Sequence, residues 1–325
     1  MSVRVGAVDC GTNSVKLLVV DLPEDPSRDP RASRAPQEVL RQGWMTRLGQ
    51  DVDATGRLAP EALERTLDAV REIAGLVREH GCDRVRFVAT SAARDASNGE
   101  EFRDGVREIL GVEAEVVEGT EEAALSFEGA VRGLAGAGVD LTDPVLVVDI
   151  GGGSTELVLG TGGEVQHAVS LDVGSVRLTE RVLRDDPPTP AQVEQAVDWL
   201  DELLGEAAVA AGVDVRRART VVGVAGTVTT LAAVARGQET YDHDALHGVR
   251  LTADDVAGTT EQLLGQTVAQ RTQLGAMHPG RADVIAAGAL VLDRVARRAA
   301  TAEVVVSAAD VIDGIAWSLV GPPRP

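Results

Sequence analysis

A glycine-rich stretch near the middle of the chain combines residue types that bind phosphate. Residues 151–155 are Gly-Gly-Gly-Ser-Thr and lie between Asp149 and Glu156. Glycines let the backbone approach a ligand and point its N–H groups at phosphate oxygens, and Ser154 and Thr155 add hydroxyl donors. The two carboxylates are oxygen ligands suited to a Mg²⁺ ion that bridges phosphates. The alternative is a glycine-rich β-turn whose carboxylates are only solvated.

A second turn with the same pattern occurs 140 residues earlier. After Asp9 the chain continues Cys-Gly-Thr-Asn-Ser, so Gly11 and Ser14 correspond to Gly151 and Ser154 of the later copy. In both copies an aspartate ends an apolar run, and apolar residues resume after the serine. Either stretch alone is explained by a plain turn. Two matched turns predict two similar domains that grip one phosphate chain in the cleft between them.

Two adjacent acids, Glu121 and Glu122, follow Thr120 at the expected start of a helix, where Thr120 is a candidate N-cap. Acids in a first helical turn are favoured by the helix dipole, so their position needs no functional explanation. The functional interpretation is a general base that activates water against a phosphoryl group.

Two further segments follow expected strands and have groups suited to phosphate. Residues 90–94 read as a helix start that ends in Arg94, whose guanidinium could clamp a phosphate through two hydrogen bonds or could lie on the surface. Residues 223–227, Gly-Val-Ala-Gly-Thr, open a helix. Small residues there permit flat contact with a nucleotide, or only close packing of the helix on its strand.

His243 and His247 are four positions apart and have Asp242 and Asp244 as neighbours. This spacing allows both imidazoles to face one metal ion if the segment is helical. Histidines in a loop or on the surface are the interpretation that we favour.

Strands alternate with helices in both halves of the chain, which indicates an α/β architecture. Apolar runs over residues 3–9 and 15–21 flank the first turn, and runs over residues 145–150 and 157–159 flank the second. A proline-rich loop is expected over residues 23–36. Further strands are expected over residues 39–48, 85–89, 112–117, 220–224 and 304–307. Helices are expected from Pro60 to a stop at Gly81 and over residues 102–110, 120–132, 191–211, 283–298 and 311–319. A connection is expected over residues 133–138.

Composition limits the possible functions. The 325 residues carry a formal charge of −20, which argues against a nucleic-acid partner and against an anionic membrane surface. Two cysteines are too few for a disulfide framework or a cysteine-rich zinc site. Residues 1–20 are interrupted by charges and predict neither a signal peptide nor a membrane span. We therefore expect a cytoplasmic protein.

These motifs, in this order, resemble the exopolyphosphatase / guanosine pentaphosphate phosphohydrolase (Ppx/GppA) family, in its short, two-domain actinobacterial type. The resembling segments are residues 8–14, 89–94, 119–123, 148–156, 223–227 and 279–283. The resemblance implies two ribonuclease-H-like domains of the actin, Hsp70 and sugar-kinase superfold, with a cleft between them. We expect domains at residues 1–126 and 127–325, and no C-terminal helical domain of the HD type.

The resemblance also implies roles for individual residues. Glu122 becomes the catalytic base, and the metal site comprises Asp149 and Glu156 with Asp9, which orients metal-bound water. Mg²⁺ is the expected ion, with Mn²⁺ as the alternative. The reaction is attack of water on the terminal phosphorus, with the shortened polyphosphate as leaving group. The implied phosphate-binding residues are Asn13, Ser14, Arg94, Gly151, Gly152, Gly153 and Ser154.

The chain departs from the family pattern at two places. Many relatives have arginine at the position of Ala124, and many have Arg-Glu-Gly where residues 312–314 are Ile-Asp-Gly. Both changes remove a positive charge, so an acidic chain needs another local path for a polyanion. The candidate cations are Arg41, Arg47, Arg271 and Arg281.

The primary hypothesis is therefore an exopolyphosphatase that acts on short chains of inorganic polyphosphate. One alternative is hydrolysis of pppGpp to ppGpp. Another is a catalytically weak sensor that binds (p)ppGpp, and a third is a related kinase that transfers phosphate from ATP. The resemblance implies a homodimer as a further possibility, which no surface pattern in the sequence decides.

Overall fold

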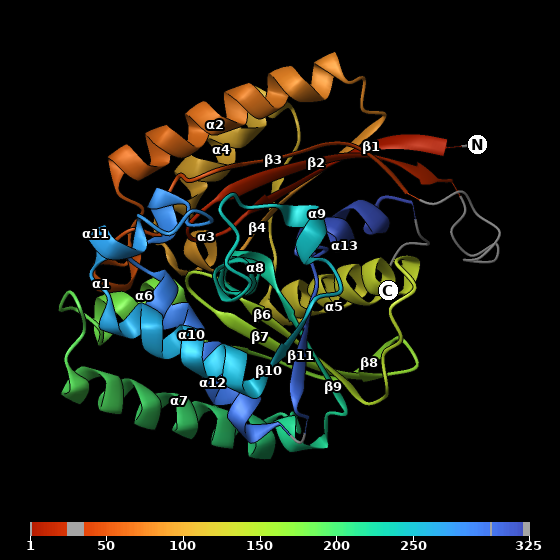
Figure 1. Cartoon of the computed structure of the whole chain (residues 1–325). Coiled ribbons are helices and arrows are strands. Elements are labelled where there is room, and N and C mark those ends of the chain that lie inside the picture. Colours follow the sequence, from red (N-terminus) through yellow and green to blue (C-terminus); the bar gives the residue numbers. More distant parts are fainter. Residues whose placement is uncertain (1, 25–35, 300, 321–325) are drawn as a thin grey trace. The chain divides into compact units, whose positions relative to one another are not determined.

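A computed structural model describes residues 2–24, 36–299 and 301–320, and the chain in it forms two α/β units (Figure 1). Unit 1 comprises Met1–Gly129 and Val311–Pro325, and unit 2 comprises Ala130–Asp310. The expected α/β fold class is confirmed by two mixed sheets with their helices. The expected division at residue 126 differs from the structure in two ways, because the chain leaves unit 1 three residues later and returns to it at Val311. Most of the loop expected over residues 23–36 lies outside the described residues.

Unit 1 is built on a five-stranded sheet in the order β3-β2-β1-β4-β5. Its first three strands form an antiparallel meander, and β4 and β5 continue the sheet parallel to β1. This order and these directions are the ribonuclease-H-like arrangement that the family resemblance implied. The strands are β1 (Ser2–Cys10), β2 (Val15–Pro23), β3 (Gln37–Trp44), β4 (Arg84–Ala89) and β5 (Ala114–Val116).

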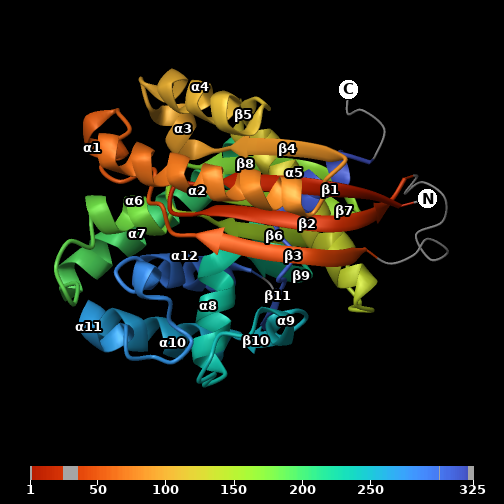
Figure 2. The same cartoon turned by 90° about the horizontal axis from the view of Figure 1, so that it is seen from above.

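Helices cover both faces of this sheet. Figures 1 and 2 show α2 and α4 side by side, and their apolar faces pack with Val8 and Cys10 of β1. The other face, with Ala7 and Leu18, packs against α13 and the first half of α5. Because α5 continues to Gly136, the connection expected over residues 133–138 is wrong for its first four positions. The helices are α1 (Val52–Thr55), α2 (Pro60–Glu79), α3 (Ser91–Asp95), α4 (Gly99–Leu110), α5 (Gly119–Gly136) and α13 (Val311–Ser318).

The return of the chain to unit 1 has a clear physical cause. Ile312 and Ile315 of α13 are fully buried in the cluster that includes β1 and β2. Gly314 lies against the backbone carbonyl of Leu125 in α5, where a side chain would not fit. Asp313 accepts two hydrogen bonds from Arg41 of β3, at 2.7 and 3.2 Å. The helix expected over residues 311–319 therefore closes the first domain and not the second.

Unit 2 has a six-stranded sheet in the order β10-β11-β9-β6-β7-β8. Again three strands form an antiparallel meander, and β9 and β11 run parallel to β6. One large apolar cluster fills the space between the sheet and helices α6, α7, α8, α10 and α12. The strands are β6 (Val145–Ile150), β7 (Thr155–Thr161), β8 (Glu164–Leu171), β9 (Thr220–Val224), β10 (Arg250–Thr252) and β11 (Glu303–Val306). The helices are α6 (Ser175–Arg181), α7 (Pro190–Ala210), α8 (Ala225–Ala235), α9 (His243–Leu246), α10 (Ala253–Gly265), α11 (Val268–Arg271) and α12 (Ile285–Arg298), with 3₁₀ turns η1 (Val215–Arg217) and η2 (Pro279–Arg281).

The internal repeat seen in the sequence is a repeat of structure. We call β1, β2 and their connection hairpin 1, with turn 1 at residues 11–14, and β6, β7 and their connection hairpin 2, with turn 2 at residues 151–154. Asp9 pairs with Lys16 across hairpin 1, and Asp149 pairs with Glu156 across hairpin 2. The 140-residue shift thus preserves strand register as well as sequence pattern.

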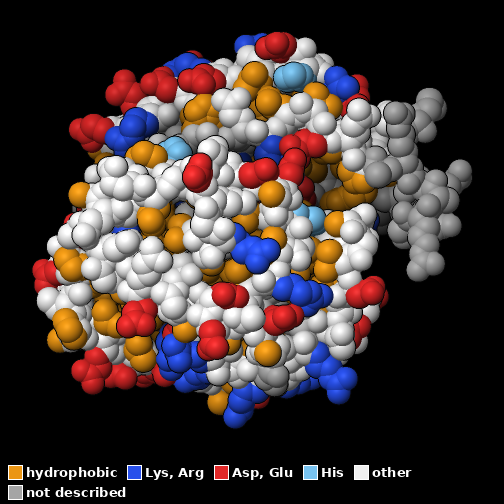
Figure 3. Space-filling view, in the orientation of Figure 1, with side chains coloured by type: hydrophobic (Ala, Val, Ile, Leu, Met, Phe, Trp, Pro, Cys, Tyr) orange, Lys and Arg blue, Asp and Glu red, His pale blue; other side chains and the backbone are white. Residues whose placement is uncertain are grey.

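The surface shows no segregation of charge on the face drawn in Figure 3, where acidic and basic side chains are intermixed. Acidic side chains are prominent along α2, where Glu61, Glu64 and Asp68 are exposed beside Arg65 and Arg71. Among the described residues, no helix is both long enough and apolar enough to cross a membrane.

Candidate phosphate and metal site

The two turns are closed by the same hydrogen bond. The N–H of Gly11 donates to the carbonyl of Ser14 at 3.0 Å, and the N–H of Gly151 donates to the carbonyl of Ser154 at 3.0 Å. Each turn therefore joins its strands without a change of register. The orientation of the other peptide groups in each turn determines whether their N–H groups are available to a ligand.

In turn 1 two carbonyl groups are held by a neighbouring loop of unit 1. The carbonyl of Thr12 accepts from the N–H of Gly49 at 2.9 Å, and that of Asn13 accepts from the N–H of Arg47 at 3.0 Å. In a trans peptide the N–H of the next residue points opposite to the carbonyl. The N–H groups of Asn13 and Ser14 consequently point away from that loop. The side-chain Oδ1 of Asn13 is buried and accepts no hydrogen bond from any described residue.

In turn 2 the carbonyl groups accept hydrogen bonds from the start of a helix. The carbonyl of Gly151 accepts from the N–H of Ser175, and that of Gly152 accepts from the N–H groups of Val176 and Arg177, at 2.9 to 3.1 Å. These donors are the first residues of α6, whose N–H groups have no partners within the helix. The N–H groups of Gly152 and Gly153 therefore point away from α6. This orientation is what a phosphate-binding turn requires.

Each anchor contains a glycine that the contact requires. A Cβ on Gly174 would lie 2.5 Å from the carbonyl oxygen of Gly152, and a Cβ on Gly49 would overlap the methyl group of Thr12. Neither glycine was singled out in the sequence. The sequence carries no signal for this role, because single glycines after strands and in loops are common. The close contact of each glycine with a turn is visible only in the folded structure.

Asp149 and Glu156 lie directly opposite each other on β6 and β7, and Ser170 of β8 continues the same row. Both acids are buried, at 5% and 1% exposure, and the hydroxyl of Ser170 donates to Glu156 Oε1 at 2.7 Å. Like charges opposite each other in a strand pair are unfavourable, and a bound cation removes that penalty. Mg²⁺ is usually held by one or two carboxylates together with substrate phosphates, so this donor set fits the ion. Within the described ranges, no group of three or more metal-binding side chains is gathered.

The corresponding row in hairpin 1 has different chemistry. Asp9 lies opposite Lys16, which lies opposite Gly43 of β3. Lys16 Nζ is 3.8 Å from Asp9 Oδ2. Sequence reasoning assigned Asp9 to the metal and gave Lys16 no role. A usable signal existed, because Lys16 follows Asp9 by the same seven positions that separate Glu156 from Asp149.

The structure separates the two adjacent acids of α5. The Glu121 side chain is 45% exposed and forms an ion pair with Arg86 at 2.7 Å. The Glu122 side chain is 10% exposed and lies 3.7 Å from Arg94 Nη1. Because α5 begins at Gly119, Thr120 lies inside the first turn, and the expectation that it caps the helix is wrong.

Unit 1 thus brings several expected residues to one edge of its sheet. The Thr12 and Ser91 hydroxyls are hydrogen bonded at 2.9 Å, which links turn 1 to α3. Arg94 lies at the end of that short helix, and its Nη1 donates to the carbonyl of Val117 at 2.8 Å while it faces Glu122. In unit 2, turn 2 lies beside the Asp149–Glu156 pair in the same way.

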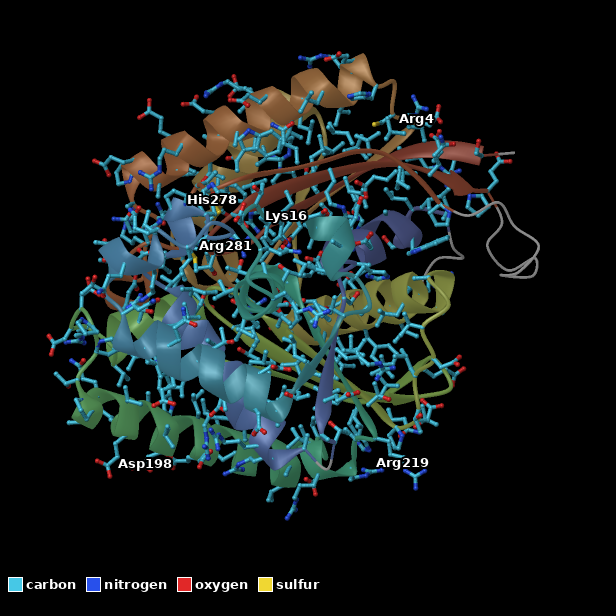
Figure 4. The ribbon with its side chains drawn as sticks, viewed as in Figure 1. Arg4, Lys16, Asp198, Arg219, His278 and Arg281 are labelled. Atoms are coloured by element: carbon cyan, nitrogen blue, oxygen red, sulfur yellow. The ribbon has the colours of Figure 1, made fainter. Side chains whose placement is uncertain are left out.

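Other candidates have structural roles. Arg41 is bonded to Glu38 and Asp313, and the buried Arg271 donates to the carbonyls of Gln266 and Ala282. These contacts stabilise the fold, and they engage the two guanidinium groups that a polyanion would otherwise bind. Arg281, labelled in Figure 4, lies against Gly226 at the start of α8 and fills the space in which flat contact with a nucleotide was considered.

The two histidines do not form a metal site. His243 Nε2 lies 3.0 Å from the carbonyl oxygen of Ala308, and His247 Nδ1 accepts from the N–H of Ala308 at 3.1 Å. Both imidazoles thus contact the backbone of Ala308, two residues before unit 2 ends at Asp310. His278 accepts a hydrogen bond from the N–H of Gly280, and its burial and the nearby Arg281 lower its pKa.

Comparisons with known proteins show which family and which solved structures the chain is similar to. The sequence model of the Ppx/GppA phosphatase family matches residues 29–321. Exopolyphosphatase 2 of Mycobacterium tuberculosis is 46% identical over 98% of this chain and 99% of its own length. A crystal structure of an exopolyphosphatase-like protein has a TM-score of 0.88 and 44% identity, covering 98% of this chain and 99% of that one. The Aquifex aeolicus member of the Ppx/GppA family has a TM-score of 0.80 and 30% identity, covering 98% of both chains.

Proposed function

Since the chain belongs to the Ppx/GppA phosphatase family, we propose that it hydrolyses the terminal phosphoanhydride bond of inorganic polyphosphate, with Glu122 as general base and Mg²⁺ as the cofactor. The observation that carries the proposal is the pair of anchored turns, whose N–H groups point away from their anchors. Backbone donors held in this way bind phosphate oxygens without rearrangement.

Glu122 accepts the proton of the attacking water in the proposed reaction. The water oxygen bonds to the terminal phosphorus, the bridging P–O bond breaks, and the shortened polyphosphate leaves with the electron pair of that bond. Two features support Glu122 over Glu121: its side chain is buried, and it faces the guanidinium of Arg94. Arg94 is held by the carbonyl of Val117, so its position is fixed before substrate binds.

Asp149 and Glu156 would hold Mg²⁺, with the hydroxyl of Ser170 orienting Glu156. When bound, the ion supplies positive charge to the phosphate oxygens. Mn²⁺ prefers the same oxygen ligands and is the alternative ion for this site. The residues of the two turns bind the phosphate oxygens in the proposal: Asn13, Ser14, Gly151, Gly152, Gly153 and Ser154.

We further propose short chains as the preferred substrate. A long polyanion needs a continuous row of cations, and two of the four candidate arginines are engaged within the protein. The name of the Mycobacterium tuberculosis relative supports polyphosphate as the substrate class. Hydrolysis of pppGpp is the alternative that the same chemistry serves.

The deciding experiment measures phosphate release with Mg²⁺ from short polyphosphate, long polyphosphate, pppGpp and ATP at matched concentrations of terminal phosphate. The proposal expects the fastest release from short polyphosphate. Faster release from pppGpp would make the chain an alarmone hydrolase. Binding of ppGpp without release from any of these compounds would make it a sensor.

Two variants in α5 test the role of Glu122. Glu122→Gln is expected to lower kcat by at least about 10², because a general base contributes roughly 10²–10⁴. Glu121→Gln, one residue away and exposed, is the matched control and is expected to retain activity. Phosphate release by Glu122→Gln within a few-fold of the unchanged protein contradicts the assignment.

A further inference from the structure

The loop that holds turn 1 has an unusual backbone. We call residues 45–51, between β3 and α1, the anchor loop, because the N–H groups of Arg47 and Gly49 bind the carbonyls of turn 1. Arg47 and Asp51 have φ angles of 52° and 58°, and they are two of the three non-glycine residues with positive φ in the part of the chain that the structure describes. Such conformations are costly and persist only where surrounding contacts enforce them.

A buried hydroxyl group adds to the cost of this loop. Thr46 is 3% exposed, and its Oγ1 is buried without a hydrogen-bond partner among the described residues. A buried polar group without a partner loses its hydrogen bonds to water and gains none in return. The anchor loop therefore depends on contacts from other elements of unit 1.

Helix α2 supplies side-chain contacts to the anchor loop. Arg65 Nε donates to the carbonyl of Thr46 at 3.1 Å, and Arg65 Nη2 donates to Gln50 Oε1 at 3.3 Å. Seven residues further along the helix, Glu72 Oε2 accepts from Trp44 Nε1 at 2.8 Å, at the end of β3. Residues seven apart lie on the same face of a helix, two turns from each other. One face of α2 thus contacts the chain where it enters the anchor loop and again within the loop.

A chain of hydrogen bonds runs from Arg65 to turn 1. The carbonyl of Thr46 and the N–H of Arg47 belong to one peptide group, and that N–H donates to the carbonyl of Asn13 at 3.0 Å. The carbonyl of Asn13 shares a peptide group with the N–H of Ser14, which donates to no group among the described residues. In a trans peptide the carbonyl and the N–H point opposite ways. The guanidinium of Arg65 thus lies at one end of two peptide groups in series, and the N–H of Ser14 lies at the open end.

We propose that Arg65 is a positioning residue of the phosphate site, which orients and polarises the N–H of Ser14 through this chain of bonds. The inference deepens the proposed function and rests on it for the polyphosphate ligand. Hydrogen bonds in series polarise one another, so a cation at the first carbonyl makes the last N–H a stronger donor to an anion. The same bonds hold the left-handed backbone of Arg47, so the N–H of Ser14 is directed before a ligand binds.

Binding of inorganic tripolyphosphate tests the inference. Calorimetry with Mg²⁺ is carried out in the Glu122→Gln background, which is expected to bind without turnover. There Arg65→Met is expected to raise Kd about three- to tenfold, the value of one hydrogen bond. Arg65→Lys keeps the charge and a donor and is expected to recover part of the affinity. Arg71→Met is the matched control on the same helix, because Arg71 pairs with Asp68 within α2, and its Kd should stay near that of the background protein.

Two further readouts separate positioning from a general loss of stability. With Glu122 intact, Arg65→Met is expected to raise KM by the same factor and to leave kcat within about twofold, because neither Glu122 nor Arg94 takes part in the chain of bonds. Hydrogen exchange of the ligand-free protein, followed by mass spectrometry, should become faster at residues 11–14 in Arg65→Met. Exchange at residues 151–154 is the internal reference and should not change, because α6 anchors that turn.

Each result has a defined meaning. Equal Kd values for Arg65→Met and Arg71→Met, no recovery in Arg65→Lys, or unchanged exchange at residues 11–14 overturns the inference. Faster exchange throughout unit 1 with a matching loss of kcat would show that Arg65 only stabilises the fold, and it also overturns the inference. Failure of the unchanged protein to bind tripolyphosphate refutes the proposed function together with the role of Arg65. Hydrolysis of polyphosphate that does not respond to Arg65→Met refutes this inference alone.

Discussion

Hairpin 1 and hairpin 2 share a backbone plan and differ in charge. Both have an aspartate near the end of their first strand and close the turn with the same hydrogen bond. In both, a neighbouring segment donates hydrogen bonds to carbonyl groups of the turn. Across from the aspartate, one has Lys16 and the other has Glu156. The difference teaches that the backbone of the turn belongs to the repeated fold, whereas the charge of the side chain seven positions after the aspartate is specific to each copy.

The anchors of the two turns also differ. A loop around Arg47 and Gly49 holds turn 1, and the first residues of α6 hold turn 2. Arg47 adopts a left-handed backbone, with φ of 52°, to direct its N–H at Asn13. A helix start supplies such N–H groups without unusual dihedral angles. Unrelated segments thus produce the same orientation of the turn.

The most severe test of this comparison copies the charges of hairpin 1 into hairpin 2. Glu156→Lys is expected to lower phosphate release by about 10² or more and to resist rescue by added Mg²⁺, because even an outer partner of a metal ligand is worth about 10–100-fold. A Mg²⁺ titration of phosphate release measures the effect.

Two controls bracket that result. Glu156→Gln removes the negative charge without adding a positive one, so raised Mg²⁺ should restore part of its activity. Asp149→Asn should likewise raise the Mg²⁺ concentration needed for activity. An unchanged Mg²⁺ titration in Glu156→Lys would remove the acid pair from the metal site.

Local patterns in the sequence were sufficient for much of the fold. The apolar runs around both turns predicted the hairpins, and apolar residues at helical spacing predicted α2, because core-facing elements carry strong periodicity. Strand β8 was missed, since half of the residues in Glu164–Leu171 are polar and all but Leu171 are at least partly exposed. The return of α13 to unit 1 was also missed, because the contacts of Ile312 and Gly314 join residues far apart in the sequence.

The site divides in a similar way. Gly151, Gly152 and Gly153 predict, by residue type alone, a turn suited to binding phosphate. Spacing could not decide between Glu121 and Glu122, whereas burial and the two different arginine partners distinguish them. Arg41 and Arg271 looked like free cations in the sequence, because residue spacing does not show that Arg41 pairs with the remote Asp313 or that Arg271 donates to the carbonyl of Ala282. Sequence reasoning thus identified the glycine-rich turn better than it identified the partners of the charged side chains.

The anchors can be compared by adding one methyl group to each. Gly174→Ala puts a Cβ 2.5 Å from the carbonyl of Gly152, so the backbone of turn 2 must move. Gly49→Ala meets chiefly side-chain atoms of Thr12, which can shift more readily than a backbone carbonyl. Overpacking costs roughly 1–3 kcal/mol, and we expect Gly174→Ala near the top of that range and Gly49→Ala near the bottom. Chemical denaturation and tripolyphosphate affinity measure both effects.

Gly205→Ala in α7 is the matched control, because a Cβ there meets nothing within 4 Å. A helical alanine is favoured over glycine by about 0.5–1 kcal/mol, so this variant should be slightly more stable. Equal destabilisation by Gly174→Ala and Gly49→Ala would mean that turn 2 is no more tightly anchored than turn 1.

The smallest expected effect concerns the motion of hairpin 1. Cys10 precedes turn 1, and complete burial raises the pKa of its thiol well above the usual value. The thiolate is the reactive form, so alkylation of Cys10 requires hairpin 1 to open. Tripolyphosphate with Mg²⁺ at its Kd should slow that alkylation about twofold, if opening and binding exclude each other.

Cys82 provides the internal reference for this measurement. It is half-buried at the far end of the β1–β4 pair, where burial also raises its thiol pKa, though less than for Cys10. Its alkylation should be faster than that of Cys10 and should not respond to tripolyphosphate, because the ligand contacts turn 1 and not the start of β4. Slowing of both thiols together would show that the ligand stabilises all of unit 1, and slowing of neither would exclude turn 1 as a phosphate-binding element. Only a selective effect on Cys10 assigns the bound anion to hairpin 1, the side of the comparison that carries Lys16.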